Sequence, residues 1–210
     1  MDLLLIRHGH SVGDDERRIK GSWDVELTPK GLKQARLLKE KLEKENYKCD
    51  LLFSSPLKRA AQTAEAASQA VGKPIIYDSR LREQDSGKIA GMTREEVSKF
   101  SPPPDEKGYR NYVPIPGGES LLDHIRRVSE FYLELIDKHM DKRVCIVTHG
   151  GTINVLLRII YNLPVNQPYV DKHIYLFAMN DTAMSRLIIR GPQDVITYYL
   201  NNFSHLTAMK

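Results

Sequence analysis

The sequence has few cysteines and no long apolar run. Its 210 residues include two cysteines, Cys49 and Cys145, which we expect to be small buried hydrophobes in a reducing compartment rather than a disulfide or a metal pair. The apolar run at the N-terminus ends at Arg7, too early for the core of a signal peptide, and no stretch approaches a membrane span. We therefore expect a cytoplasmic protein without a membrane partner.

The chain also lacks a large excess of positive or negative residues. The chain has 31 basic and 27 acidic residues, for a net charge of +4, and no block of like charges. Nucleic-acid binding normally needs a concentrated basic patch, so no nucleic-acid partner is expected. A hydrophobic content of 41% and a charged content of 28% are typical of globular proteins. The length favours one domain, residues 1–210, with a substantial core.

Strand-like and helix-like patterns alternate along the chain, which predicts an α/β architecture. Strands are expected at residues 3–6, 50–53, 74–77 and 144–148, and in the C-terminal third around 174–178 and 185–189. Helices are expected to begin at Thr28-Pro29, at Ser55-Pro56, at Ser120 and near Thr152, because the first three carry capping residues and all four precede periodic apolar positions. In the first helix, Leu32, Ala35, Leu38 and Leu42 are expected to form the apolar face. Proline-rich residues 101–118 exclude a helix or a central strand, and we interpret them as a lid loop.

Two His-Gly steps, each directly after a short apolar run, stand out from this pattern. They are Arg7-His8-Gly9 and His149-Gly150-Gly151. Such runs are typical of buried parallel strands, and ligands of open α/β sheets bind just beyond the carboxyl ends of these strands. The two imidazoles could therefore face each other across one crevice.

That arrangement suits phosphoryl transfer, which needs a nucleophile, fixed positive charge and an acid for the leaving group. His8 is the candidate nucleophile, Arg7 would meet the anion, and His149 would donate hydrogen bonds while Gly150 allows close backbone approach. Either histidine could instead be a structural residue hydrogen-bonded at a strand end. The other histidines considered are interpreted as structural, namely His124, His139, His173 and His205, and no residues show metal-ligand spacing.

Two further charged residues complete the candidate site. Arg59 lies in the first turn of a predicted helix, and this end of a helix already carries a partial positive charge. Two positive charges at one place are explained if a phosphate binds there. Glu83 follows the third strand and is a candidate proton donor. Taken singly, each could be an ordinary solvated side chain.

With these residues the chain resembles the histidine phosphatase superfamily, which has the phosphoglycerate mutase-like fold. The matching segments occur in order along nearly the whole chain: Arg7-His8-Gly9, residues 21–31 from Gly21, residues 54–64 around Arg59, Leu81-Arg82-Glu83 with Gly87 and Gly91, Gly118-Glu119-Ser120, and Thr148-His149-Gly150-Gly151. The resemblance implies a three-layer α/β/α sandwich with a mostly parallel central sheet and no metal or organic cofactor. It also implies a phosphohistidine at His8, a phosphate pocket of Arg7, Arg59 and His149, and Glu83 as proton donor.

Three positions depart from the family pattern: His10, Asp14 and Lys20. An aspartate beside a bound dianion would repel it unless neutralised. We hypothesise that Lys20 pairs with Asp14 and keeps the pocket positive, next to Gly21; alternatively, Asp14 orients Arg7.

The expected activity is that of a phosphoric monoester hydrolase of the histidine acid type, acting on a small phosphorylated metabolite. The residues after Glu83 are similar to the compact phosphatase branch of the family. Two alternatives stay open, a cofactor-dependent phosphoglycerate mutase and a non-catalytic module that binds phosphorylated ligands. The substrate would be selected by the lid and the pocket rim, where His10, Tyr109, Arg110 and Tyr112 are candidates.

Overall fold

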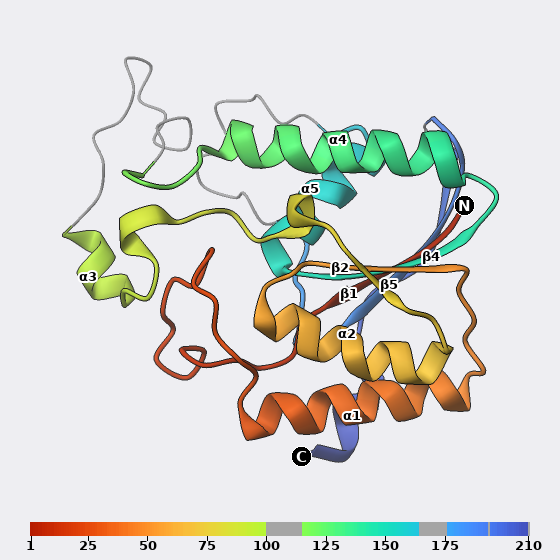
Figure 1. Ribbon diagram of the computed structural model, residues 1–210, viewed down its shortest axis with the longest axis horizontal. Helices are drawn as coiled ribbons and strands as arrows, with labels where there is room; N and C mark the ends of the chain where they lie inside the picture. Colours follow the sequence, from red (N-terminus) through yellow and green to blue (C-terminus); the bar gives the residue numbers. More distant parts are fainter. Residues whose placement is uncertain (100–114, 164–175, 193, 210) are drawn as a thin grey trace.

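The protein, described here from a computed structural model, is a three-layer α/β/α sandwich (Figure 1). The structure describes residues 1–99, 115–163, 176–192 and 194–209. The strands are β1 (Asp2–Arg7), β2 (Leu51–Ser54), β3 (Ile75–Tyr77), β4 (Arg143–Thr148), β5 (Met184–Gly191) and β6 (Asp194–Asn202). The helices are α1 (Pro29–Lys44), α2 (Lys58–Val71), α3 (Arg94–Ser98), α4 (Leu121–His139) and α5 (Gly150–Ile160), with short 3₁₀ turns at Ser79–Leu81, Gly87–Ile89 and Ser204–Met209.

The six strands form one sheet in the order β3-β2-β4-β1-β5-β6. The first four of these are parallel, while β5 and β6 are antiparallel additions at one edge. The mostly parallel sheet is therefore confirmed. Its register pairs Arg7 with Thr148, so the residues that follow β1 and β4 emerge side by side at the same sheet edge.

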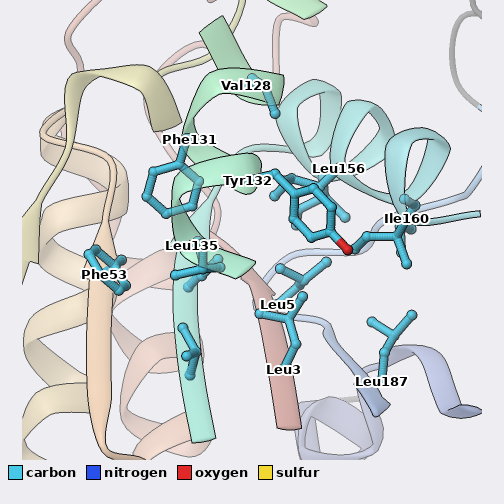
Figure 2. Packing of buried hydrophobic residues seen from close by; sticks show 14 of the residues in the cluster. Leu3, Leu5, Phe53, Val128, Phe131, Tyr132, Leu135, Leu156, Ile160 and Leu187 are labelled. Carbon is cyan, nitrogen blue, oxygen red and sulfur yellow. The ribbon is translucent and has the colours of Figure 1, made fainter. Parts of the chain in front are cut away.

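Strand β1 is buried on both faces, which explains its unbroken apolar run. Leu3 and Leu5 pack under α4 and α5 with Val128, Phe131 and Leu156 (Figure 2). Leu4 and Ile6 point to the other face, where α1 and α2 cover them. Because side chains alternate between the two faces along β1, this strand contributes to the hydrophobic core on each side of the sheet.

Most helix starts follow the predicted capping chemistry. Thr28 caps α1, and Ser120 caps α4 in a capping box with Asp123. The second helix begins later than expected, at Lys58, because Leu57 has an extended backbone (φ −64°, ψ 134°) and is the N-cap residue; the Ser55 hydroxyl contacts His149.

Two of the structural predictions are wrong. Leu32 is 53% exposed, since the buried stripe of α1 runs through Gly31, Ala35 and Leu38, one position away from it. Residues 176–178 are not a strand, because the side-chain amide of Asn154 takes both backbone groups of Phe177. Both cysteines are buried and free, as expected.

Most of the expected lid lies outside the described residues. Its described end, residues 115–118, packs on the turn at Gly87, where Lys88 N–H donates to the carbonyl of Pro116 at 3.0 Å. In the described part of the chain, no helix is both long and apolar enough to cross a membrane.

Candidate active site

A cavity of about 420 Å³ opens beyond the carboxyl ends of β1 and β4. Most of the predicted site residues line it: Arg7, His8, Lys20, Gly21, Arg59, Glu83 and Gly150. His149 lies directly behind His8, with ring centroids 5.1 Å apart. Asp14 lies behind Lys20 rather than on the cavity wall.

His8 is held in a single tautomer. Its Nδ1 is 2.7 Å from the carbonyl oxygen of Gly9, which can only accept, so Nδ1 carries the proton. Its Nε2 accepts from Arg59 Nε at 3.3 Å. Burial lowers the pKa of His8 well below its ordinary value, and the charge of Arg59 adds to this effect. The result is a neutral imidazole whose lone pair is on Nε2.

His149 is held in the same tautomer as His8. Its Nε2 is 2.8 Å from the hydroxyl of Ser55, and that hydroxyl accepts from Leu57 N–H at 3.3 Å. The proton of Ser55 is therefore available to Nε2, which leaves the proton of His149 on Nδ1. This Nδ1 is buried, and among the described residues it has no hydrogen-bond partner. Burial lowers the pKa of His149 well below its ordinary value, with Arg59 next in effect.

Arg59 is 1% exposed and lies in the first turn of α2. Its two terminal nitrogens donate to the carbonyl oxygens of Trp23 and Gly21, both at 2.7 Å. These carbonyls offset a cation that would otherwise be unfavourable at the positive end of a helix. The same contacts tie the loop between β1 and α1 to the site.

Arg7 extends from the end of β1 and is paired with Asp181, Nη1 to Oδ1 3.4 Å. It also donates to the carbonyl of Met179. The alternative in which Asp14 orients Arg7 is therefore wrong, because the carboxylate beside Arg7 is that of Asp181. No local sequence signal could identify Asp181, since it approaches Arg7 only because β5 pairs with β1.

The hypothesis that Lys20 pairs with Asp14 is confirmed. Lys20 Nζ donates to Asp14 Oδ1 and, at 2.8 Å, to the hydroxyl of Ser11. Burial alone would raise the pKa of Asp14, but the hydrogen bond and charge of Lys20 hold it below its ordinary value. Burial also lowers the pKa of Lys20, against the effect of Asp14. Asp14 and Lys20, two of the residues that depart from the family pattern, thus form an ion pair without net charge beside the cavity.

Glu83 contacts the start of α5. Its two carboxyl oxygens accept from the backbone N–H groups of Gly151 at 2.9 Å and Gln84 at 3.0 Å. Arg127 steadies the same segment by donating to the carbonyl of Glu83 at 3.0 Å. Arg127 is itself paired with Glu119. Two backbone N–H groups therefore fix the carboxyl group at the cavity wall, and Arg127 holds the backbone carbonyl of the same residue.

Some specificity candidates lie elsewhere. His10 is buried away from the cavity, where its ring contacts Thr28 and Asp15, so the prediction of His10 as a rim residue is wrong. Tyr109, Arg110, Tyr112 and His173 lie outside the described residues. The cavity includes cations that the sequence analysis did not select, Arg18 and Arg94. Both lie in polar segments with no motif to mark them.

Two of the histidines interpreted as structural contact hydroxyl groups through one ring nitrogen. His124 contacts Thr152 Oγ1 at 3.1 Å, and His205 contacts Thr182 Oγ1 at 2.8 Å. Within the described part of the chain, no three His, Cys, Asp or Glu side chains cluster as a metal site would require.

The comparisons with known proteins agree with this geometry. The chain is 38% identical over 159 residues to phosphoglycerate mutase-like protein 4 of Arabidopsis thaliana, covering 74% of this chain and 69% of that protein. It is 35% identical over 153 residues to phosphoserine phosphatase 1 of Hydrogenobacter thermophilus, covering 70% of each. The solved structure of a mycobacterial glucosyl-3-phosphoglycerate phosphatase in complex with VO3 superimposes with a TM-score of 0.78 at 27% identity, over 95% of this chain and 98% of that one. The sequence model of the histidine phosphatase superfamily (branch 1) matches residues 3–199, and the chain belongs to that family.

Proposed function

We propose that this protein is a metal-independent phosphomonoesterase of the histidine acid type that acts on a small phosphorylated metabolite through a phosphohistidine. The observation that carries the proposal is the neutral imidazole of His8, whose Nε2 lone pair lies beside Arg59 in a cavity lined by cations. An uncharged nucleophile next to fixed positive charge is what attack on a phosphate dianion requires.

The proposed reaction has two steps. His8 Nε2 attacks phosphorus as the ester P–O bond breaks, and Glu83 gives its proton to the leaving oxygen. Arg7, Arg59 and the free Nδ1–H of His149 would stabilise the charge on the transferring phosphoryl oxygens. Water, losing its proton to Glu83, then attacks phosphorus, and the P–N bond breaks to release phosphate and restore His8.

Turnover of p-nitrophenyl phosphate tests this proposal. His8→Ala should abolish product release, and mass spectrometry of quenched wild-type enzyme should find one phosphoryl group on His8. His139→Ala is the control, because it removes an imidazole that does not line the cavity. Normal turnover by His8→Ala would refute the phosphohistidine, and binding of phosphate esters without turnover would favour a binding module.

A mutase is the second candidate, because several relatives carry phosphoglycerate mutase or mutase-like names. In that reaction a bound phosphorylated sugar acid, rather than water, would accept the phosphoryl group from His8. Incubation with 3-phosphoglycerate separates the two reactions: formation of the positional isomer indicates a mutase, and release of inorganic phosphate indicates a phosphatase.

A further inference from the structure

The backbone that leads into Glu83 is held by side chains from two helices. Thr152, on α5, donates from its hydroxyl to the carbonyl of Arg82 at 2.9 Å. Arg127, on α4, donates to the carbonyls of Arg82 and Glu83 at 2.8 and 3.0 Å. The two helices cover the same face of the sheet (Figure 1). The chain path that presents the Glu83 carboxyl is therefore fixed by both of them.

A buried histidine directs the hydroxyl of Thr152. That hydroxyl has one hydrogen, which it gives to the carbonyl of Arg82. His124 Nε2 lies 3.1 Å from the same oxygen, so Nε2 is the donor in this second contact. Burial lowers the pKa of His124 to about 4, so near pH 7 the ring is neutral and its one proton is on Nε2. His124 is 2% exposed and Thr152 is 0% exposed, so bulk water does not reach the contact.

The first turn of α5 holds Glu83 through two neighbouring residues. Gly151 N–H donates to Glu83 Oε2 at 2.9 Å, and Thr152 holds the carbonyl of the residue just before Glu83. The first N–H groups of a helix have no partner within the helix, so the Glu83 carboxyl takes a donor that the helix leaves open. If the Thr152 contact were lost, the Arg82 carbonyl could turn, and the carboxyl would shift relative to Gly151.

We propose that His124 and Thr152 are positioning residues for the proton donor: His124 directs the Thr152 hydroxyl to the Arg82 carbonyl, and this contact places the Glu83 carboxyl at the leaving oxygen. The inference rests on the proposed function, in which Glu83 protonates that oxygen. Neither side chain is among the described residues that line the cavity, so both act through Glu83. A purely structural role would stabilise the fold without affecting one leaving group more than another.

The kinetic test uses the double variant His124→Leu with Thr152→Val. Replacing both partners by apolar side chains leaves neither of them buried and unpaired, so the variant should fold. Its kcat/KM for an alkyl phosphate should fall about tenfold relative to that for p-nitrophenyl phosphate, which needs little protonation. Thr152→Ser keeps the hydroxyl and should keep the wild-type ratio. So should the control Ser129→Ala, which removes an α4 hydroxyl bound to the carbonyl of Ile125. An equal loss on both esters, or an unchanged ratio in the double variant, would overturn the inference.

Hydrogen exchange of the Gly151 amide, measured by NMR, separates this inference from the proposed function because it needs no turnover. The protection factor, which corrects for the altered neighbouring residue, should fall about tenfold in the double variant as the Glu83 carboxyl moves away. His124→Gln keeps an amide donor and should keep the wild-type value. Ile153 N–H, which donates to the carbonyl of His149 in the same turn, should stay protected in every variant. Absence of turnover on every ester by the wild type would refute the phosphatase, whereas unchanged protection of Gly151 in the double variant would overturn the positioning role.

Discussion

The contact between Glu83 and the start of α5 yields a sharp prediction for Gly151→Ala. A Cβ at residue 151 would lie 2.3 Å from Glu83 Oε1 and 3.0 Å from its Cδ. Since nonbonded heavy atoms settle at roughly 3.5 Å, the carboxyl group must move by about 1 Å. It would then lose the 2.9 Å hydrogen bond from Gly151 N–H that fixes it.

A displaced Glu83 should protonate leaving groups poorly. A misplacement of about 1 Å can cost on the order of 100-fold in rate. The loss should appear in kcat/KM for an alkyl phosphate, whose leaving alkoxide needs a proton, and should be much smaller for p-nitrophenyl phosphate. The quantity to measure is kcat/KM for both esters, because it reports phosphoryl transfer to His8 and excludes the later hydrolysis step.

Gly150→Ala is the matched control for this change. Its Cβ would make an ordinary contact 3.8 Å from Arg7 Nε, so the ratio between the two esters should change by less than about twofold. Neither substitution should unfold the protein, since alanine is the better helix former by about 0.5–1 kcal/mol. An equal loss on both esters in Gly151→Ala, or no loss on either, would refute the assignment of Glu83 as the proton donor.

Three further predictions concern the surroundings of the site. Lys20→Ala leaves the charge of Asp14 unpaired and should weaken binding of inorganic phosphate by about tenfold. The inhibition constant of phosphate as a competitive inhibitor measures this change. An unchanged constant would contradict the hypothesis that the pair keeps the pocket positive. Ser55→Ala removes the hydroxyl that selects the tautomer of His149 and should lower kcat by about 10- to 100-fold, whereas kinetics equal to wild type would contradict that role. Burial lowers the pKa of His124 from its ordinary value of 6.5 to about 4, so the unfolded chain binds a proton that the native state does not. The free energy of unfolding should therefore fall below pH 6.5, by up to about 1.4 kcal/mol per pH unit for this group, in urea titrations at a series of pH values. Replacing His124 with Gln should make that fall shallower, and an identical pH profile would contradict the argument.

The parts of the structure that sequence predicted best depend on local pattern. The apolar runs before His8 and His149 become β1 and β4, because a strand buried on both faces needs an unbroken run. The caps at Thr28 and Ser120 were also predictable, since capping is a contact within three residues.

The parts that sequence missed depend on contacts between distant segments. Asp181 reaches Arg7 only through the pairing of β5 with β1, which nothing near either residue encodes. His10 was misplaced on the rim because proximity to His8 in sequence does not fix where its ring points. Arg94 lies in a short polar helix without a motif, and only the shape of the cavity brings it to the site.

The cations of this site also hold the loop that surrounds it. Arg59 binds the carbonyls of Gly21 and Trp23, Arg18 binds the carbonyl of Gly91 at 2.7 Å, and Lys20 binds Asp14. These three positive charges therefore have partners before substrate arrives, and among the described residues that line the cavity Glu83 supplies the one carboxylate. Carbonyl partners leave the formal charge of Arg59 intact, so it can attract a phosphate while its geometry is already fixed. A conservative change such as Arg59→Lys would keep the charge but lose the paired carbonyl contacts, which require a guanidinium. Positive charge at residue 59 is therefore not sufficient for this site. The loop that completes the cavity is held by the planar guanidinium, and a lysine of the same charge could not hold it in the same way.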